Sequence, residues 1–173
     1  SLAIISNFLD LNNISEKFFL KFNLPEGRGD YKYIKINKKK IHLIDESYNS
    51  NPLSVSSAIK NYDLIKKGSG EKNLIMSDML ELGKHSKKLH EKIAEDINSS
   101  KIDNVYFYGS NIKHTFKKII PSKKCLFLKD KNEIINVIKN DIKNNDYLMI
   151  KGSNLTGLNN LSNRLKKGNF NAL

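Results

Sequence analysis

Residues 43–52 read LIDESYNSNP. The apolar pair Leu43 and Ile44 is followed by seven polar residues and then by Pro52. Proline is favoured in the first turn of a helix, where its missing N–H has no intrahelical partner to lose. Apolar residues then recur at helical spacing (Val55, Ala58, Ile59, Tyr62 and Ile65). This stretch therefore predicts a short buried strand, a polar loop and an amphipathic helix.

The same alternation continues to the end of the chain. Before the motif, residues 31–36 and 40–45 predict two strands around a turn at 37–39. After the first helix we expect strands over 73–77, 105–108, 125–128 and 147–150, and helices over 86–99, 111–119, 133–142 and about 157–166. Short apolar strands that alternate with amphipathic helices indicate an α/β fold: a Rossmann-like, mostly parallel sheet with helices on both faces.

Polar segments follow several of these strands, and ligands of open α/β sheets bind at the carboxyl ends of the strands. In residues 45–51, carboxylates can accept hydrogen bonds from ribose hydroxyls, asparagines can donate and accept, and the helix N-terminus favours anions. The alternative is a polar strand-to-helix loop whose side chains only satisfy the backbone. The residues alone leave both interpretations open.

Two further loops carry candidate binding groups. In SDMLELG (77–83), Asp78 and Glu81 can bind an ammonium group, or the segment can be a helix-capping turn. The loop at 151–154, KGSN, suits a phosphate or a carboxylate but is too short to be specific. The chain contains no GxxxxGK[ST] phosphate-binding loop, and its four histidines do not have the spacing of metal ligands.

Composition excludes several classes of protein. The 173 residues contain one cysteine, Cys125, which excludes a disulfide framework, and no apolar run long enough to span a bilayer. The N-terminal stretch has neither the basic start nor the cleavage site of a signal peptide, so we expect a soluble protein. The net charge of +12 suggests nucleic acid as one possible partner. However, nearly all the cations are scattered lysines, which favours a solvated surface.

The N-terminal region has a different pattern. Residues 2–22 carry apolar positions at helical spacing, and Pro25, Gly27 and Gly29 mark a linker. The chain begins at Ser1 without a methionine and runs directly into this helical pattern. We therefore expect it to be a piece of a longer protein.

Taken together, LIDESYNSNP, SDMLELG with His90 downstream, and IKGSN (150–154) resemble the C-terminal domain of the UDP-N-acetylmuramoyl-tripeptide–D-alanyl-D-alanine ligases, the MurF branch of the Mur ligase family. Residues 24–29, LPEGRG, look like the family's interdomain junction. The resemblance implies that residues 1–24 end a central ATP-binding domain, 25–30 form the linker, and 31–173 form the C-terminal domain. Ser77 stands where the family usually has glycine.

The resemblance also implies an activity. Enzymes of this family use ATP and Mg²⁺ to phosphorylate the carboxylate of the UDP-linked tripeptide, and the amine of D-alanyl-D-alanine then attacks the acyl phosphate. Their Mg²⁺ ligands and phosphate-binding loop lie in the central domain, and the UDP site lies in the N-terminal domain. We therefore expect no catalytic residue or metal ligand here, no ligase activity from this chain alone, and a monomer in the bacterial cytoplasm with no nucleic-acid or membrane partner.

Site residues carry over only where the motifs match. The resemblance assigns ATP binding to Arg28, Asp45, Glu46 and Asn49, and binding of D-alanyl-D-alanine to Asn51, Asp78, Glu81, Lys151 and Ser153. The alternatives are a domain of a sister Mur ligase or a folylpolyglutamate synthase-type enzyme, a basic nucleic-acid-binding module, and an interaction domain without chemistry. All the ligase interpretations require three polar turns, which are distant in sequence, to meet at one edge of the sheet.

Overall fold

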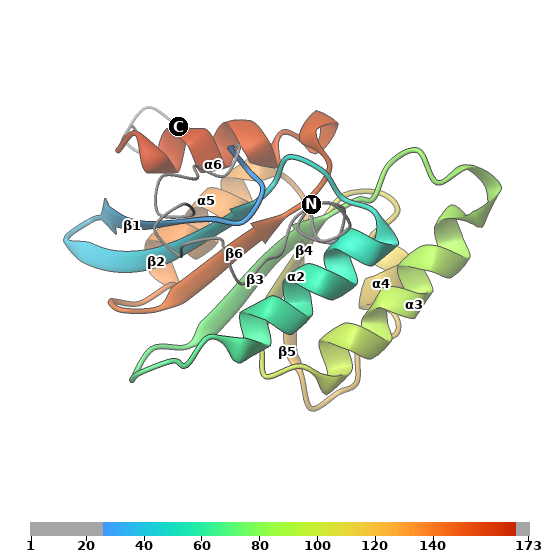
Figure 1. Ribbon diagram of the computed structural model, residues 1–173, viewed down its shortest axis with the longest axis horizontal. Helices are drawn as coiled ribbons and strands as arrows, with labels where there is room; N and C mark the ends of the chain where they lie inside the picture. The colour runs from blue at the N-terminus through green and yellow to red at the C-terminus, as the bar shows by residue number, and fades with distance from the viewer. Residues whose placement is uncertain (1–25, 169–173) are drawn as a thin grey trace, which may run out of the picture.

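A computed structural model describes residues 26–168, which form a six-stranded sheet covered by helices (Figure 1). The strand order is β1-β2-β6-β3-β4-β5. Strands β2 to β6 run parallel to one another. The edge strand β1 is antiparallel to its neighbour β2. The strands are β1 (Asp30–Ile36), β2 (Lys39–Glu46), β3 (Lys72–Ser77), β4 (Asn104–Tyr108), β5 (Lys124–Leu128) and β6 (Tyr147–Lys151).

Helices connect the parallel strands. They are α2 (Pro52–Leu64), α3 (Ser86–Ser99), α4 (Lys113–Phe116), α5 (Lys131–Asn140) and α6 (Leu158–Lys166), with 3₁₀ turns η3 (Gly83–His85) and η4 (Asn154–Thr156). Pro52 is the first residue of α2, and the side chain of Asn51 caps this helix by accepting a hydrogen bond from the N–H of Ser54 at 2.9 Å. The short loop before α2 therefore has a fixed direction.

The β1–β2 hairpin closes through a two-residue turn. Asn37 and Lys38 both have positive φ, at 46° and 68°, as the twist of a tight hairpin requires. The register pairs Ile36 with Lys39 at the turn and Asp30 with Asp45 at the far end. The hairpin thus brings the start of β1 to the carboxyl end of β2.

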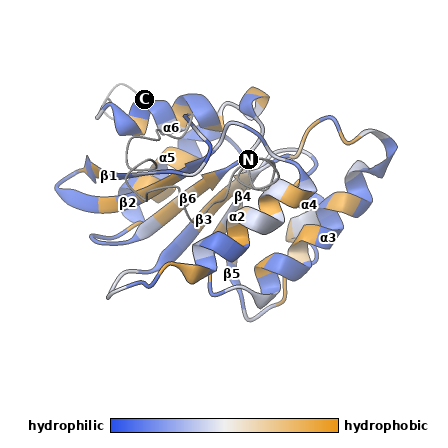
Figure 2. Ribbon diagram, viewed as in Figure 1, coloured by the Kyte–Doolittle hydropathy of each residue, from blue (hydrophilic) through white to orange (hydrophobic). Residues whose placement is uncertain are grey.

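Alternating strand residues divide between two apolar cores, one on each face of the sheet (Figure 2). On one face Leu74 and Met76 of β3 pack with α2 and α3, and on the other Ile75 packs with α5 and α6. Every residue of both cores lies between positions 34 and 165. Within the described residues, the sheet therefore carries an apolar core on each of its faces.

The predicted α/β class and its strand and helix order are confirmed, with one correction. The helix predicted over 111–119 is confined to Lys113–Phe116. Beyond it, the N–H groups of Lys118 and Ile119 bond to carbonyls three residues back, so the end of the segment tightens into turns. The predicted helical segment 2–22 and the predicted domain end at 1–24 lie outside the described residues.

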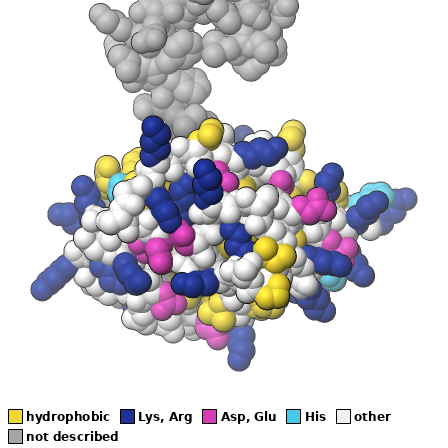
Figure 3. Space-filling view, turned by 90° about the horizontal axis from the view of Figure 1, so that it is seen from below, with side chains coloured by type: hydrophobic (Ala, Val, Ile, Leu, Met, Phe, Trp, Pro, Cys, Tyr) yellow, Lys and Arg dark blue, Asp and Glu magenta, His cyan; other side chains and the backbone are white. Residues whose placement is uncertain are grey.

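On the face in Figure 3, acidic side chains lie among the basic ones. This arrangement does not focus a positive potential on one element, as a nucleic-acid-binding surface would. None of the helices within residues 26–168 is both long and apolar enough to cross a bilayer.

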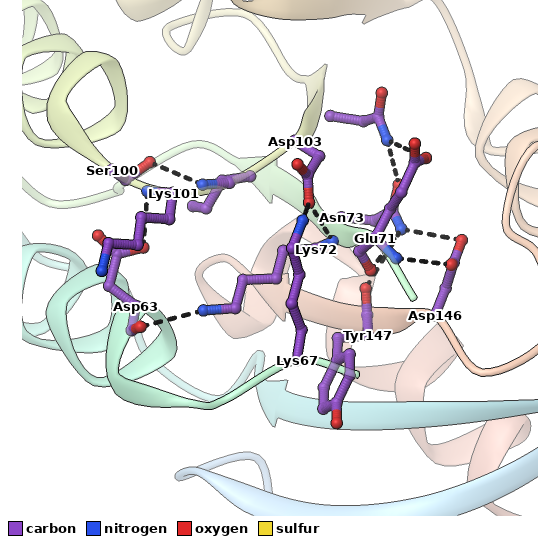
Figure 4. Close-up of polar contacts among 12 residues, drawn as sticks. Asp63, Lys67, Glu71, Lys72, Asn73, Ser100, Lys101, Asp103, Asp146 and Tyr147 are labelled. Carbon is purple, nitrogen blue, oxygen red and sulfur yellow. Dashed lines mark hydrogen bonds and ion pairs between the residues drawn. The ribbon is translucent and has the colours of Figure 1, made fainter. Parts of the chain in front are cut away.

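A polar network closes the amino-terminal edge of the sheet, opposite the predicted site (Figure 4). Asp103 accepts hydrogen bonds from the N–H of Lys72 at 2.7 Å and from the Lys67 ammonium at 2.5 Å. The Lys72 ammonium donates to the carbonyls of Tyr62 and Asp63 at 2.7 and 3.1 Å. These contacts attach the end of α2 to the sheet, and the polar groups in them have their partners within the protein.

Candidate functional site

Three loops meet at the carboxyl edge of the sheet because β2, β6 and β3 are neighbours there. Glu46 at the end of β2 pairs in register with Lys151 of β6, which is also the register partner of Met76 in β3. The loops that follow, 47–51, 152–157 and 78–83, therefore leave the sheet side by side. The juxtaposition of three distant polar turns that the sequence predicts is present.

One hollow of about 380 Å³ lies among all three loops; we name it the Glu81 hollow. Glu81 and Asn49 are exposed, whereas Ser153 is buried with only 8% of its surface exposed. The hollow thus combines a carboxylate, an amide and a hydroxyl with apolar contacts. Its full lining is Tyr48, Asn49, Leu80, Glu81, Ser153, Asn154 and Leu155.

A second hollow of about 370 Å³, named here the Glu46 hollow, opens between the start of β1 and α2. Its polar lining includes Arg28, Glu46 and Asn61, with Tyr31 and Met149 among the remaining residues. Arg28 is exposed, and its guanidinium lies 4.6 Å from the ring centre of Tyr48, a residue of the Glu81 hollow. The Arg28–Tyr48 contact thus joins the linker to the loop that borders both hollows.

The Glu46 carboxylate is half-buried, which raises its pKa above the ordinary value, while Lys151 partly opposes that shift. The Lys151 ammonium is 3.8 Å from the Glu46 carboxylate. It donates to the backbone carbonyls of Asn49 at 2.5 Å and of Glu46 at 3.3 Å. Lys151 is 1% exposed and lines neither hollow, so it supports the 46–49 loop from beneath.

Asp45 is also buried, with no exposed surface. Its carboxylate accepts hydrogen bonds from the N–H and the hydroxyl of Ser47 at 3.1 and 2.5 Å, and forms an ion pair with Lys166 of α6 at 2.7 Å. Of the acidic pair in the motif, Glu46 therefore faces a hollow and Asp45 faces the interior.

Asp78 and Asn51 act as caps in the structure. The Asp78 carboxylate accepts bonds from the N–H groups of Ser110, Asn111 and Ile112 at 3.1, 2.9 and 2.7 Å, at the entry to α4. Asn51 caps α2, as described above. Neither side chain lines the Glu81 hollow, in contrast to Glu81 itself.

Ser153 and Ser77 hold the loops at the end of β6 and β3. The Ser153 hydroxyl accepts a hydrogen bond from the N–H of Leu80 at 3.1 Å. Ser77 is fully buried and its hydroxyl donates to that of Thr156 at 2.9 Å. A Cβ on Gly152 would lie 2.2 Å from the Ser77 hydroxyl oxygen, so the serine is accommodated because residue 152 has no side chain.

The sequence favours a surface or helix-capping position for His90, and the surface position is wrong because the side chain has no exposed area. His90 is fully buried in α3, and its Nε2 accepts a hydrogen bond from the N–H of Met79 at 3.1 Å. The proton therefore lies on Nδ1, which faces the carbonyl of Ser86 at 2.8 Å. A neutral His90 thus anchors the 78–83 loop to α3.

We expect His90 to make folding sensitive to acid. Burial is the main cause that lowers its pKa, with a smaller contribution in the same direction from His114, and Asp78 and the Ser86 carbonyl oppose them. Because the unfolded chain binds this proton more readily, its contribution to stability is complete above the ordinary histidine value. It is lost as the pH falls through the lowered pKa, by at most about 1.4 kcal/mol per pH unit. Denaturant unfolding of the chain at a series of pH values measures this slope.

The variant His90→Gln retains an acceptor but cannot titrate, so its stability should depend less on pH than that of the wild type. His85→Gln is the matched control, since His85 is exposed. Part of the slope should persist in both variants, because burial and Lys40 lower the pKa of His42 as well. An unchanged slope in His90→Gln would contradict the assignment.

Comparisons with known proteins agree with this geometry. Residues 32–154 match the family model described as Mur ligase, glutamate ligase domain. The chain belongs to the Mur ligase family. The matched range starts at the third residue of β1 and ends just after β6, so it includes the 46–51, 78–83 and 151–154 loops.

Curated Mur ligases with the same printed name are among the relatives. The chain is 30% identical over 141 residues to the UDP-N-acetylmuramoyl-tripeptide–D-alanyl-D-alanine ligase of Rickettsia prowazekii, covering 81% of the chain and 30% of that relative. It is 28% identical over 116 residues to the ligase of that name from Bacillus subtilis, covering 65% of the chain and 25% of that relative. The chain thus spans less than a third of the length of either relative.

A solved structure confirms the fold. The MurF ligase of Thermotoga maritima in complex with ADP superposes with a TM-score of 0.72 at 22% identity, covering 96% of the chain and 36% of that structure. The Mur ligase domain fold is therefore shared, and the sequence expectation of a Rossmann-like C-terminal domain is confirmed.

Magnesium does not fit this part of the protein. Within residues 26–168, no three His, Cys, Asp or Glu side chains gather closely enough to hold a metal ion. Two of the motif carboxylates are bound within the protein: Asp45 pairs with Lys166, and Asp78 accepts hydrogen bonds from three backbone N–H groups. The described residues therefore do not form a Mg²⁺ site.

Proposed function

We propose that this chain is the C-terminal domain of an ATP-dependent ligase that adds D-alanyl-D-alanine to UDP-N-acetylmuramoyl-tripeptide in peptidoglycan synthesis. The observation that carries the proposal is the Glu81 hollow, where three motif loops supply a carboxylate, an amide and apolar side chains. A small zwitterionic dipeptide with two methyl groups matches this lining. The curated relatives bear the name of this reaction.

The dipeptide fits the Glu81 hollow by charge and size. The exposed Glu81 carboxylate provides a partner for the ammonium group, and Leu80 and Leu155 provide apolar contacts for the methyl groups. Asn49, which the resemblance assigns to ATP, lines this hollow and not the Glu46 hollow, so we assign its amide to the dipeptide. Its amide nitrogen makes no hydrogen bond with the described residues. Ser153 and Asn51 then act by holding the loops, and Asp78 and Lys151 do the same from buried positions.

The nucleotide fits the Glu46 hollow. Glu46 offers a carboxylate for ribose hydroxyls, and Arg28 offers a guanidinium for phosphate oxygens. Both groups lie at the carboxyl edge of the sheet, where a preceding ATP-binding domain can meet them. ATP here is a substrate shared between domains; the groups that activate the carboxylate, together with the Mg²⁺ ligands and the UDP site, belong to the preceding domains.

This assignment sets the expected organisation of the whole enzyme. Residues 1–24 end the central ATP-binding domain, 25–30 join it to this domain, and 31–173 form the C-terminal domain. The enzyme works as a monomer in the bacterial cytoplasm, where its nucleotide-linked substrates are made, and it needs no nucleic acid or membrane.

The assay of the reaction uses the complete ligase and the 173-residue chain in parallel. The complete enzyme should release phosphate only with ATP, the UDP-linked tripeptide and D-alanyl-D-alanine together, and the product mass should increase by one dipeptide. The chain alone should release none. Phosphate release with L-alanine, D-glutamate or a folate substrate instead of the dipeptide would assign the domain to a sister ligase or a folylpolyglutamate synthase-type enzyme.

Glu81→Ala should weaken dipeptide binding with little effect on folding, because its exposed carboxylate has no hydrogen-bond partner among the described residues. Loss of one ion pair to a ligand predicts a KM for D-alanyl-D-alanine about tenfold to a hundredfold higher, with the KM for ATP unchanged. Glu91→Ala, which removes a carboxylate on α3 outside the hollow, is the control. Equal KM values for Glu81→Ala and wild type would remove Glu81 from the site.

A further inference from the structure

The glycine-containing linker is packed against this domain. Gly27 and Gly29 have positive φ values of 73° and 89°, and a Cβ on Gly27 would lie 2.9 Å from Tyr48 and from Asn159 of α6. These glycines therefore permit left-handed backbone and close contact. The two glycines that mark the linker in the sequence are thus held in packed positions.

Backbone hydrogen bonds attach the linker to the end of β2. The N–H of Gly29 donates to the carbonyl of Asp45 at 2.8 Å, and the N–H of Tyr48 donates to the carbonyl of Gly27 at 3.1 Å. The N–H of Gly27 in turn donates to the Asp30 carboxylate at 2.8 Å. These bonds hold the backbone on both sides of Arg28 against the end of β2, next to Glu46.

One buried cation holds the carboxylates of this arrangement together. The Lys166 ammonium of α6 forms ion pairs with Asp45 at 2.7 Å and Asp30 at 3.1 Å. The exposed fractions of the three side chains are 6% for Lys166, 0% for Asp45 and 16% for Asp30. Asp30 and Asp45 are register partners across the hairpin, so without the lysine two carboxylates would face each other away from water.

We propose that Lys166 is a positioning residue that fastens Gly27–Asp30 to the end of β2, so that Arg28 and Glu46 move as one unit with this domain. Lys166 forms its ion pairs with Asp30 and Asp45, and it lines neither hollow itself. Its effect on a ligand is therefore exerted through the two carboxylates. Although burial lowers the pKa of Lys166, the hydrogen bonds to Asp45 and Asp30 outweigh this and keep the ammonium charged.

The first test is hydrogen exchange on the 173-residue chain, which does not depend on the proposed function. The amides of Gly27, Gly29 and Tyr48 should be protected in the wild type, and Lys166→Met should reduce their protection about tenfold or more. Lys67→Met is the control, because it removes a Lys–Asp ion pair at the opposite edge of the sheet (Figure 4). It should leave these three amides unchanged.

A second, milder variant keeps the proposal testable if Lys166→Met does not fold. Asp30→Asn leaves the buried Lys166–Asp45 pair intact and keeps an oxygen for the Gly27 N–H, but it weakens the link to the linker. It should reduce the protection of Gly27 and Gly29 less than Lys166→Met does. Wild-type exchange of Gly27 and Gly29 at the rate of an unstructured peptide, or no change in Lys166→Met, would overturn the proposal.

The second test measures kinetics in the complete ligase and rests on the proposed function. Lys166→Met should raise the KM for ATP about tenfold and the KM for D-alanyl-D-alanine clearly less, because Arg28 and Glu46 both line the nucleotide-side hollow whereas only Tyr48 of the Glu81 hollow is bonded to the Gly27–Asp30 segment. A variant that loses protection at Gly27 and Gly29 but raises both KM values equally would refute this nucleotide-side role. The exchange result would stand in that case, so the two failures can be distinguished.

Discussion

Lys151→Met is expected to destabilise the domain and to abolish ligand binding at the same time. The substitution leaves the carbonyls of Glu46 and Asn49 without their buried donor, and it removes the cation beside the Glu46 carboxylate. Loss of one partner from such a buried group costs about 3 kcal/mol. Denaturant unfolding of the chain measures this loss, and titration with ATP and with D-alanyl-D-alanine in the complete ligase measures binding.

Lys72→Met provides a closely matched control for this experiment. Lys72 is also a buried lysine on a sheet strand, 2% exposed, and its ammonium also donates to two backbone carbonyls, but at the opposite edge of the sheet. Both variants should lose comparable stability, and only Lys151→Met should lose binding. Normal affinities in Lys151→Met at a temperature where it is folded would show that the lysine does not shape the loop.

Asp78→Ala should produce the second large effect, on stability. The buried carboxylate accepts three backbone N–H groups and the Ser110 hydroxyl, and all four donors would lose their acceptor. We expect a loss of about 3 kcal/mol or more in unfolding free energy. Thermal or denaturant unfolding of the chain measures it directly.

The comparison of Asp78 with Glu81 separates support from binding within one loop. Below its melting temperature, Asp78→Ala in the complete ligase should retain dipeptide affinity better than Glu81→Ala, although it is the less stable of the two. A higher KM for D-alanyl-D-alanine in Asp78→Ala than in Glu81→Ala would show that Asp78 contacts the dipeptide directly, as the family motif alone implies. Asp78→Asn, which keeps one acceptor oxygen, should lie between wild type and Asp78→Ala in stability.

The fold was predictable because hydrophobic periodicity changes along the chain from helical to strand spacing and back. The strands are short and apolar on both sides, as parallel strands covered by two helical layers must be. The helix start predicted from Pro52 is confirmed, since α2 begins at this residue. The exception, the segment predicted as a helix over 111–119, depends on a distant residue: the Asp78 carboxylate binds the N–H groups of residues 110–112.

The site was predictable at the level of loops but not at the level of atoms. Motif order placed Asn49, Glu81 and Ser153 at one edge of the sheet, and they line one hollow. Whether a polar side chain points into a hollow or into the protein depends on partners far away in sequence. Lys166, 121 residues after Asp45, decides the environment of that carboxylate. It occupies the last turn of a helix, where a lysine is unremarkable in sequence.

The packing of Ser77, Gly152 and Thr156 limits how this domain can be re-engineered. The serine hydroxyl occupies the space above Gly152 and donates to Thr156, which in turn donates to the carbonyl of Ser153 at 2.6 Å. A KGSN loop grafted onto another scaffold would therefore need the residue at the end of the neighbouring strand to be transferred with it. The transferable module comprises two strand ends, because a turn with any residue other than glycine at position 152 would place a Cβ 2.2 Å from the Ser77 hydroxyl oxygen.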